Sequence, residues 1–333
     1  MILAGDIGAS KCNLALVEKR EDGFHVQHKR GFSSRSFSQL ARVVAAFLEE
    51  AQEIVASAPA AKIVAAGFGV AGPVIAGQVR LTNLGWEVNS KSLARQIGTS
   101  CVVLLNDLEA TAYGLRWLGP GQLHTLNPGT PRPQAAQALI AAGTGLGEAI
   151  LHWGDDRYIV APTEGGHCDF APRTGQEIEL LRYMKRAGGP VSFEMVLSGR
   201  GFLTLHEFLD PRVRHPGFDG SETDPAPEIT RRALDGSCPV CVQALDMWVS
   251  LYGAEAGNLA LKTLSLGGLF VAGGIVARIL PKMTDGTFFR AFCLKSKFAG
   301  LLSQIPVHVV LSDEAPLLGA AAEAARALGQ LKS

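Results

Sequence analysis

The sequence predicts an α/β protein built from two similar halves. Strand-like apolar runs alternate with stretches whose apolar residues recur at helical spacing, which is typical of α/β folds. A glycine-rich strand–turn–strand containing Asp6-Ile7-Gly8 is followed later by a strand ending in Ala71-Gly72-Pro73. The same order returns with Gly143-Thr144-Gly145 and then Ala272-Gly273-Gly274. Two like halves that face each other would form a ligand cleft between them.

The composition limits the classes of partner. The 333 residues suit two domains or one large α/β unit, and 47% of them are hydrophobic, which excludes global disorder. Lys and Arg total 31, as do Asp and Glu, so the formal net charge is zero. Because polyanion binders normally carry surplus positive charge, neither nucleic acid nor a membrane surface is expected as a partner. With no predicted signal peptide or membrane span, a cytoplasmic protein is expected.

The elements of the first half follow from local patterns. Apolar residues at helical spacing, among them Leu40, Val43 and Phe47, predict a helix over residues 38–56 with Ser38 as its N-cap. The remaining expected elements are a strand–turn–strand at 1–17, strands at 24–30, 63–70 and 102–105, and helices at 93–97 and 108–118.

The second half is expected to follow the same plan. Its last helix begins at the acidic turn Asp313-Glu314, and residues 128–137 and 211–227 are expected to be loops. The expected strands are 138–142, 148–153, 269–272 and 307–311, and the expected helices are 175–187, 238–264 and 315–328.

Two glycine-rich turns are candidate phosphate sites, because small residues expose successive backbone N–H groups. Beside the first turn, Asp6 is placed to hold a hydrated Mg²⁺, Ser10 to bond a phosphate oxygen and Lys11 to add positive charge. The second turn, Gly143–Gly147, is followed by a strand rather than a helix, which disfavours a nicotinamide site. An ordinary hairpin turn is the alternative for both.

Three further motifs are candidates for catalysis or ligand binding. Asp107, after Asn106, is either a general base or a cap of the next helix. Glu164-Gly165-Gly166-His167 suits sugar hydroxyls, which donate and accept hydrogen bonds, although a metal site or a surface loop is the alternative. Gly273-Gly274 suits an adenosine lying against backbone, or close helix–strand packing.

The cysteines and histidines give no metal signature. Cys238 and Cys241 form a single CxxC, and a structural zinc site would need two more ligands at matching spacing, which the sequence lacks. The other histidines form no cluster along the chain. The CxxC is therefore expected to lie by chance at a loop and helix start.

Taken in order, these motifs resemble the bacterial ATP-dependent glucokinase family of the hexokinase and actin-like ATPase fold. The resemblance also includes Leu81–Trp86, Ser192–Gly199 and Tyr252–Ala260, and it extends from Leu3 to about Ala325. It implies a duplicated two-lobed, ribonuclease H-like α/β fold with a central cleft. The small lobe would comprise residues 1–107 and 314–333, and the large lobe residues 108–313.

The resemblance also implies an activity and its residues. The protein would be a transferase that phosphorylates D-glucose at the 6-hydroxyl with ATP and Mg²⁺, the first step of glycolysis, and would form a homodimer. Asp107 would be the general base, and Asp6 would hold Mg²⁺ through water. The sugar-binding residues would be Asn83, Asn106, Asp107, Glu164, His167 and Glu194. The ATP-binding residues would be Asp6, Gly8, Ala9, Ser10, Lys11, Gly143, Thr144, Gly145, Gly273 and Gly274.

Two alternatives stay open. One is a kinase for another hexose, such as mannose, glucosamine or N-acetylmannosamine. The other is a non-catalytic sugar sensor on the same fold. Ala9, where the family usually has glycine, and Gly85, where some members have proline, are the only hints of a sensor, and Asp107 argues against it because a sensor needs no base.

Overall fold

The computed structural model describes residues 1–52, 62–81, 83–216, 218 and 224–332. The chain divides into unit 1, formed by Met1–Pro120 with Ser312–Ser333, and unit 2, formed by Gly121–Leu311. The sequence instead placed the first boundary after residue 107. It lies later because the helix that starts at Asp107 packs against the C-terminal helix within unit 1.

Unit 1 is organised around a five-stranded sheet. Strand order is β3-β2-β1-β4-β7, with antiparallel hairpins joining β1, β2 and β3, and parallel pairing of β1 with β4 and of β4 with β7. The strands are β1 (Ile2–Ile7), β2 (Lys11–Arg20), β3 (Gly23–Ser33), β4 (Ala65–Val70) and β7 (Val102–Asn106). The strands β5 (Gln78–Leu81) and β6 (Trp86–Asn89) form a separate hairpin.

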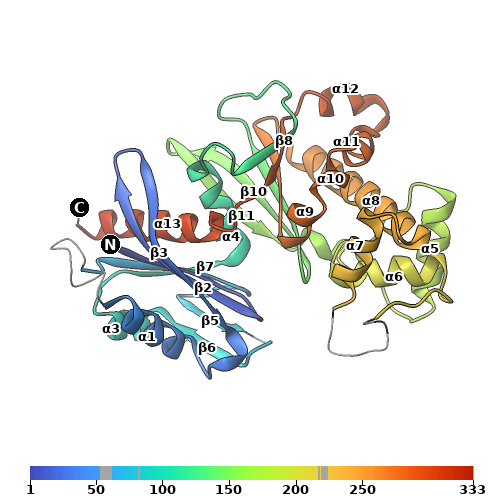
Figure 1. Ribbon diagram of the computed structural model, residues 1–333. Helices are drawn as coiled ribbons and strands as arrows, with labels where there is room; N and C mark the ends of the chain where they lie inside the picture. Colours follow the sequence, from blue (N-terminus) through green and yellow to red (C-terminus); the bar gives the residue numbers. More distant parts are fainter. Residues whose placement is uncertain (53–61, 82, 217, 219–223, 333) are drawn as a thin grey trace. The chain divides into compact units, whose positions relative to one another are not determined.

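Different helices cover the two faces of this sheet. Along β1, Leu3 and Ile7 join the core under α1 (Leu40–Glu50), whereas Ile2 and Ala4 join the core under α13 (Ala315–Lys332). Figure 1 shows α1 and α3 (Ser90–Ile97) on one side of the sheet and α13 with α4 (Asp107–Gly114) on the other. Because side chains alternate along a strand, Asp6 faces the side of α13 and α4.

The helices α4 and α13 cross at unusually short range. A Cβ atom at Gly319 would lie 1.8 Å from the carbonyl oxygen of Ala110, and one at Gly114 would lie 1.8 Å from that of Ala315. Only glycine permits this approach. The crossing holds α13 in unit 1 although α13 follows the last strand of unit 2 along the chain.

Unit 2 repeats the topology of unit 1. Its sheet has the order β11-β10-β9-β12-β13-β8, in which β9, β10 and β11 form antiparallel hairpins and β9, β12 and β13 run parallel. The first five strands thus repeat the order β3-β2-β1-β4-β7, which confirms the duplication predicted from the two glycine-rich turns. The strands are β8 (Leu123–Asn127), β9 (Gln137–Ala142), β10 (Leu146–Gly154), β11 (Arg157–Thr163), β12 (Gly268–Ala272) and β13 (Val307–Val310).

Most helices of unit 2 pack around α8 (Pro239–Thr263). Trp248 and Tyr252 of α8 are fully buried in the largest hydrophobic core of the chain. The other helices are α5 (Gly175–Lys185), α6 (Gly199–Leu209), α7 (Ala226–Leu234), α9 (Gly274–Arg278), α10 (Leu280–Met283), α11 (Thr287–Cys293) and α12 (Ala299–Leu302). Short 3-10 turns are η1 (Ser34–Ser36), η2 (Leu115–Trp117), η3 (Gly165–His167) and η4 (Ser296–Phe298).

Several elements differ from the sequence-based expectations. Ser38 is not the N-cap of α1, because Gln39 occupies that position without a side-chain cap bond. Residues 53–56 of the predicted helix lie outside the described residues. Strands β5, β6, β8 and β11 and helices α6, α7, α10, α11 and α12 were not expected. The strands β5 and β6 do alternate between exposed and buried residues, but each has only four residues, which is a weak signal in the sequence. The strands β8 and β11 are largely half-exposed and lack a period-2 pattern.

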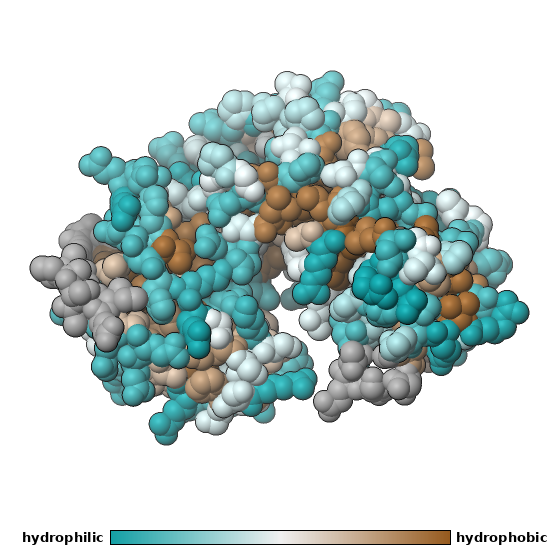
Figure 2. Space-filling model, viewed as in Figure 1, coloured by the Kyte–Doolittle hydropathy of each residue, from teal (hydrophilic) through white to brown (hydrophobic). Residues whose placement is uncertain are grey.

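Figure 2 shows hydrophilic residues over most of the visible face of each unit. Among the helices in the described part of the chain, none combines the length and apolar character needed to cross a lipid bilayer.

Candidate functional site

Three candidate residues of unit 1, Asp6, Asn106 and Asp107, lie at the carboxyl edge of its five-stranded sheet. Both β1 and β7 run parallel to β4, with Asp6 paired to Gly69 and Asn106 paired to the next residue, Val70. The parallel register therefore places Asp6 and the Asn106-Asp107 pair at one edge. Ligand sites in sheets of this kind form at that edge.

Asp6 occupies an environment that favours its neutral form. Its carboxyl pKa is raised to about 6, first by burial and then by the carboxylates of Asp107 and Asp313. The hydrogen bond from the Asn13 amide and the charge of Lys11 oppose this rise. The Asn13 Nδ2 atom donates to Asp6 Oδ2 at 3.2 Å. A cation near these three carboxylates would relieve their repulsion.

The turn between β1 and β2 is held by one backbone hydrogen bond and one side-chain hydrogen bond. Gly8 N–H donates to the Lys11 carbonyl at 3.0 Å, and the Ser34 hydroxyl donates to the Gly8 carbonyl at 2.7 Å. Ala9 is half-buried, while Ser10 and Lys11 are exposed. The turn thus presents one hydroxyl and one ammonium group to a ligand, as an anion site requires.

Asn106 and Asp107 have separate roles at the start of α4. Asn106, not Asp107, is the N-cap: its Oδ1 accepts from the N–H groups of Leu108 and Glu109, completing a capping box with the Glu109 side chain. Asn106 Nδ2 also donates to the Gly72 carbonyl at 3.3 Å. Asp107 is half-buried in the first turn, and its Oδ1 accepts the Leu108 N–H at 2.9 Å. Asn106 therefore fixes the backbone from which the Asp107 carboxylate projects.

Asn83 follows β5 rather than a strand of the five-stranded sheet. It is an exposed residue in the turn between β5 and β6, which belong to the two-stranded sheet. Its neighbours Leu84 and Gly85 donate backbone hydrogen bonds to the Leu81 carbonyl.

The glycine motifs of unit 2 meet at the ends of β9 and β12. Gly143 N–H donates to the Gly145 carbonyl at 2.8 Å, while Gly199 at the start of α6 donates to the Gly143 carbonyl at 2.9 Å. Gly273 has φ 101°, and a Cβ there would lie 2.1 Å from the Ala142 carbonyl oxygen. Gly273 is thus placed directly over the strand end that leads into the Gly143 turn. Thr144 and Gly274 are exposed beside it.

Three polar side chains converge in unit 2 next to this turn. His167 Nε2 lies 4.0 Å from Glu164 Oε2, and His167 Nδ1 lies 3.9 Å from Glu194 Oε1. The second oxygen of Glu194 accepts the Leu146 N–H at 3.0 Å. Glu194 therefore links the predicted sugar-binding residues to the predicted phosphate turn. The carboxylates of Glu164 and Glu194 can accept hydrogen bonds, and the imidazole of His167 can donate one. Neighbouring sugar hydroxyls both donate and accept, so this set of side chains suits them.

The Glu164–His167 motif turns sharply over a buried carboxyl group. A Cβ atom at Gly165 would lie 2.0 Å from Glu148 Oε2, and one at Gly166 would lie 2.0 Å from the Leu146 carbonyl. Burial, followed by the nearby Glu255 carboxylate, raises the pKa of Glu148 to about 7. Neither Glu148 nor Glu255 was predicted as a site residue from the sequence.

Two other groups were not predicted from sequence patterns. Asp313, which was predicted only as a helix start, is one of the two carboxylates that raise the pKa of Asp6. It forms an ion pair with Lys29 at 2.6 Å. The duplicated topology is the signal for Asp313, since it follows β13 much as Asp107 follows β7. The expectation of no histidine cluster is also wrong: His206 and His215 lie together with the CxxC cysteines.

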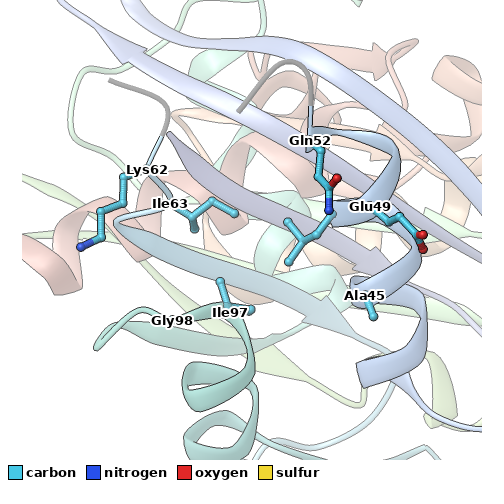
Figure 3. A pocket seen from close by; sticks show the side chains of 8 residues that line it. Ala45, Glu49, Gln52, Lys62, Ile63, Ile97 and Gly98 are labelled. Atoms are coloured by element: carbon cyan, nitrogen blue, oxygen red, sulfur yellow. The ribbon is translucent and has the colours of Figure 1, made fainter. Parts of the chain in front are cut away.

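A pocket of about 800 Å³ lies apart from all these residues. It lies in unit 1 between α1, the segment before β4 and the end of α3 (Figure 3). The residues that line it are Ala45, Leu48, Glu49, Gln52, Lys62, Ile63, Ile97 and Gly98. Since no predicted site residue lines it, the pocket is separate from the candidate site.

Comparison with known proteins identifies the relatives of this chain. The family model described as "Glucokinase" matches residues 3–327. A glucokinase from Nostoc sp. is 38% identical over 345 residues, covering 98% of this chain and 99% of its own.

Solved structures show the same relationship. The crystal structure of a glucokinase from an Antarctic psychrotroph is 31% identical, with TM-score 0.84 and 98% of each chain covered. A ROK family glucokinase from Streptomyces griseus, in complex with glucose and AMPPNP, is 20% identical, with TM-score 0.66 and coverage of 98% of this chain and 99% of its own. The second likeness concerns the fold alone, and together they confirm the actin-like ATPase fold. With the family model spanning nearly its full length, the chain belongs to the glucokinase family.

Proposed function

We propose that the protein transfers the terminal phosphoryl group of ATP to the 6-hydroxyl of D-glucose. Its family membership supports a sugar kinase. The observation that carries the residue assignment is the position of Asp107, at the N-terminus of α4 and close enough to Asp6 for its charge to raise the Asp6 pKa. A carboxylate at this edge of the sheet is suitable as a general base for a bound hydroxyl group.

In the proposed reaction, Asp107 accepts the proton of the sugar 6-hydroxyl while the oxygen of that hydroxyl attacks the γ-phosphorus of ATP. The new O–P bond forms, the bond to the bridging oxygen breaks, and ADP leaves. Positioning and charge stabilisation contribute most of the acceleration in phosphoryl transfer, and a general base adds about 10²- to 10⁴-fold.

The sugar would be held by Glu164, His167 and Glu194, supported by the convergence of these side chains in unit 2. Asn106 and Asn83 are proposed as further contacts. Asn106 Nδ2 carries two hydrogens, of which one is engaged by the Gly72 carbonyl, so one stays available to a hydroxyl.

The nucleotide would be held by the two glycine-rich turns. The β- and γ-phosphates are assigned to Gly8, Ala9, Ser10 and Lys11 in unit 1 and to Gly143, Thr144 and Gly145 in unit 2. The adenosine is assigned to Gly273 and Gly274, because the absence of side chains there leaves backbone exposed.

Mg²⁺ fits the chemistry of Asp6. Magnesium takes oxygen ligands, retains several waters and is typically held by one or two carboxylates. Asp6 supplies such a carboxylate beside those of Asp107 and Asp313. When bound with ATP, the ion would neutralise charge on the phosphates. Asp6 would hold the ion through water.

The decisive experiment measures ATP- and Mg²⁺-dependent formation of glucose 6-phosphate by wild type, Asp107→Asn and the exposed control Asp156→Asn. We expect turnover by wild type and the control, and a fall in kcat of about 10² or more for Asp107→Asn with little change in glucose binding. Near-normal turnover of the folded Asp107→Asn variant would remove Asp107 from the role.

The same assay separates the remaining alternatives. Preferred turnover of mannose, glucosamine or N-acetylmannosamine would replace glucose as the substrate. Calorimetric sugar binding without turnover of any sugar would indicate a sensor. A homodimer and a cytoplasmic location stay predictions, and light scattering on the purified chain tests the first of them.

A further inference from the structure

Two thiols and two imidazoles meet among the helices α6, α7 and α8, away from the residues assigned to sugar and ATP. Cys238 is the N-cap of α8 and Cys241 lies in its first turn. His206 belongs to the last turn of α6, and His215 lies in the segment that follows it. Figure 1 shows α6, α7 and α8 grouped at one end of unit 2.

The geometry of these four side chains suits a single small cation. One ligand atom from each residue can be chosen so that all four lie within 4.8 Å of one another. His215 Nε2 is 3.3 Å from Cys238 Sγ. In a tetrahedral zinc site, bonds of about 2.0–2.3 Å place neighbouring ligand atoms roughly 3.3–3.8 Å apart. Small side-chain adjustments therefore bring the four atoms to that arrangement.

His206 provides a second, independent indication. Its side chain is fully buried, yet neither ring nitrogen has a hydrogen-bond partner in the described part of the chain. The nearest aromatic rings are those of Phe218, at 4.9 Å between centroids, and His215, at 5.5 Å. Leaving a buried polar group unpaired is costly, so a histidine in this position needs a partner.

We propose that His206, His215, Cys238 and Cys241 bind one Zn²⁺ ion as a structural site. Two thiolates and two neutral imidazoles form a complete tetrahedral donor set for zinc, whereas calcium and magnesium require oxygen ligands. Binding would release the two thiol protons to solvent. The charge of the ion then balances the two thiolates, so the buried site carries no net charge.

The site would fasten α6 and the segment after it to the N-terminus of α8. The other end of α6 reaches the predicted phosphate turn, where the Gly199 N–H donates to the Gly143 carbonyl. Zinc would thus hold in place the helix that supports this turn. The proposal concerns the stability of unit 2 and does not depend on the sugar or the nucleotide.

The test begins with the metal content of the full chain, purified without a polyhistidine tag or chelator and analysed by mass spectrometry. We expect about one zinc per chain. His206→Ala and Cys241→Ser should lose the metal, while Cys293→Ser should retain it. Cys293 is a matched control, because it is a free cysteine of unit 2 outside the cluster.

Cobalt substitution gives a readout that needs no variant to fold. Wild type incubated with Co²⁺ should develop thiolate charge-transfer absorption and the intense visible bands of tetrahedral cobalt, and zinc should displace both. Removal of zinc by a chelator should lower Tm, with recovery when zinc is returned.

Three outcomes would overturn the proposal. A folded wild type that takes up neither zinc nor cobalt under reducing conditions has no such site. Full zinc content in both His206→Ala and Cys241→Ser places the metal elsewhere. A Cys238–Cys241 disulfide in protein isolated from cells, with no zinc uptake after reduction, makes the pair a redox pair instead.

Discussion

At the scale of single residues, Glu194 joins two parts of the candidate site. One carboxylate oxygen accepts the Leu146 N–H at the phosphate turn, and the other lies 3.9 Å from His167 Nδ1. We predict that Glu194→Gln raises KM for glucose by roughly 10- to 100-fold, because hydrogen bonds to charged groups contribute about 1.5–3 kcal/mol. The effect on kcat should be smaller.

Steady-state kinetics at saturating ATP measure both constants. Glu179→Gln is the control, since Glu179 is exposed on α5 and pairs only with Arg182 among the described residues. An unchanged KM for glucose in Glu194→Gln would exclude Glu194 from sugar binding.

Glu148 gives a pH-dependent prediction for stability. Its pKa is raised from an ordinary 4.5 to about 7, first by burial and then by Glu255. Between these values the native state retains a proton that the unfolded state has released, so stability falls as pH rises from about 4.5 to 7. Above pH 7 the full cost of the buried carboxylate is present, with an upper limit of about 3 kcal/mol.

Glu148→Gln removes this titration. We expect the variant to gain stability relative to wild type as pH rises from 5 to 8, measured by urea unfolding at each pH. Glu87→Gln, at an exposed position of β6, should show no such trend. A constant difference between Glu148→Gln and wild type across the range would contradict the raised pKa.

At the scale of elements, the crossing of α4 and α13 depends on the glycine at residue 319. A Cβ there meets the Ala110 carbonyl at 1.8 Å. We predict that Gly319→Ala lowers the free energy of unfolding by about 1–3 kcal/mol, as overpacking does in well-packed cores. Gly329→Ala in the same helix is the control, because no atom lies within 4 Å of its added Cβ.

Helix propensity alone favours alanine over glycine by about 1 kcal/mol at both positions. The two variants should therefore move Tm in opposite directions, downward for residue 319 and slightly upward for residue 329. Equal changes in the Tm of Gly319→Ala and Gly329→Ala would show that α4 and α13 can move apart without loss of stability.

At the scale of the whole molecule, the two units differ in how the chain builds them. Unit 2 is one continuous segment, Gly121–Leu311, with its own hydrophobic core. Unit 1 requires both ends of the chain, because Leu317, Leu318 and Ala321 of α13 complete its core against Ile2 and Ala4.

We predict that the isolated segment 121–311 folds and unfolds cooperatively on heating, as followed by circular dichroism. Residues 1–120 alone should fail to do so, and adding a peptide of residues 312–333 should restore structure. Cooperative unfolding of 1–120 without that peptide would show that α13 is dispensable for unit 1.

Local patterns in the sequence were sufficient for much of the fold. The two glycine-rich turns and the small triplets after later strands predicted the duplication, because backbone that approaches a neighbour or turns tightly needs residues without bulky side chains. The long helix near residues 238–264 was found because apolar residues on all its faces indicate a buried helix. Asp6 and Asp107 are predictable because a carboxylate interrupts an apolar strand at its end. Glu164 and His167 are predictable because Gly165-Gly166 permits a sharp turn that lets them converge.

The tertiary structure alone determines which residues that are distant in the chain lie close together. Asp313 reaches Asp6, and Glu255 reaches Glu148, only because strand order and helix packing bring them together. His206 and His215 meet the CxxC of α8 after an intervening helix, so no sequence spacing reports their contact. Periodicity determines which face of an element is buried, whereas the partner of that face depends on packing between elements, which local sequence does not encode.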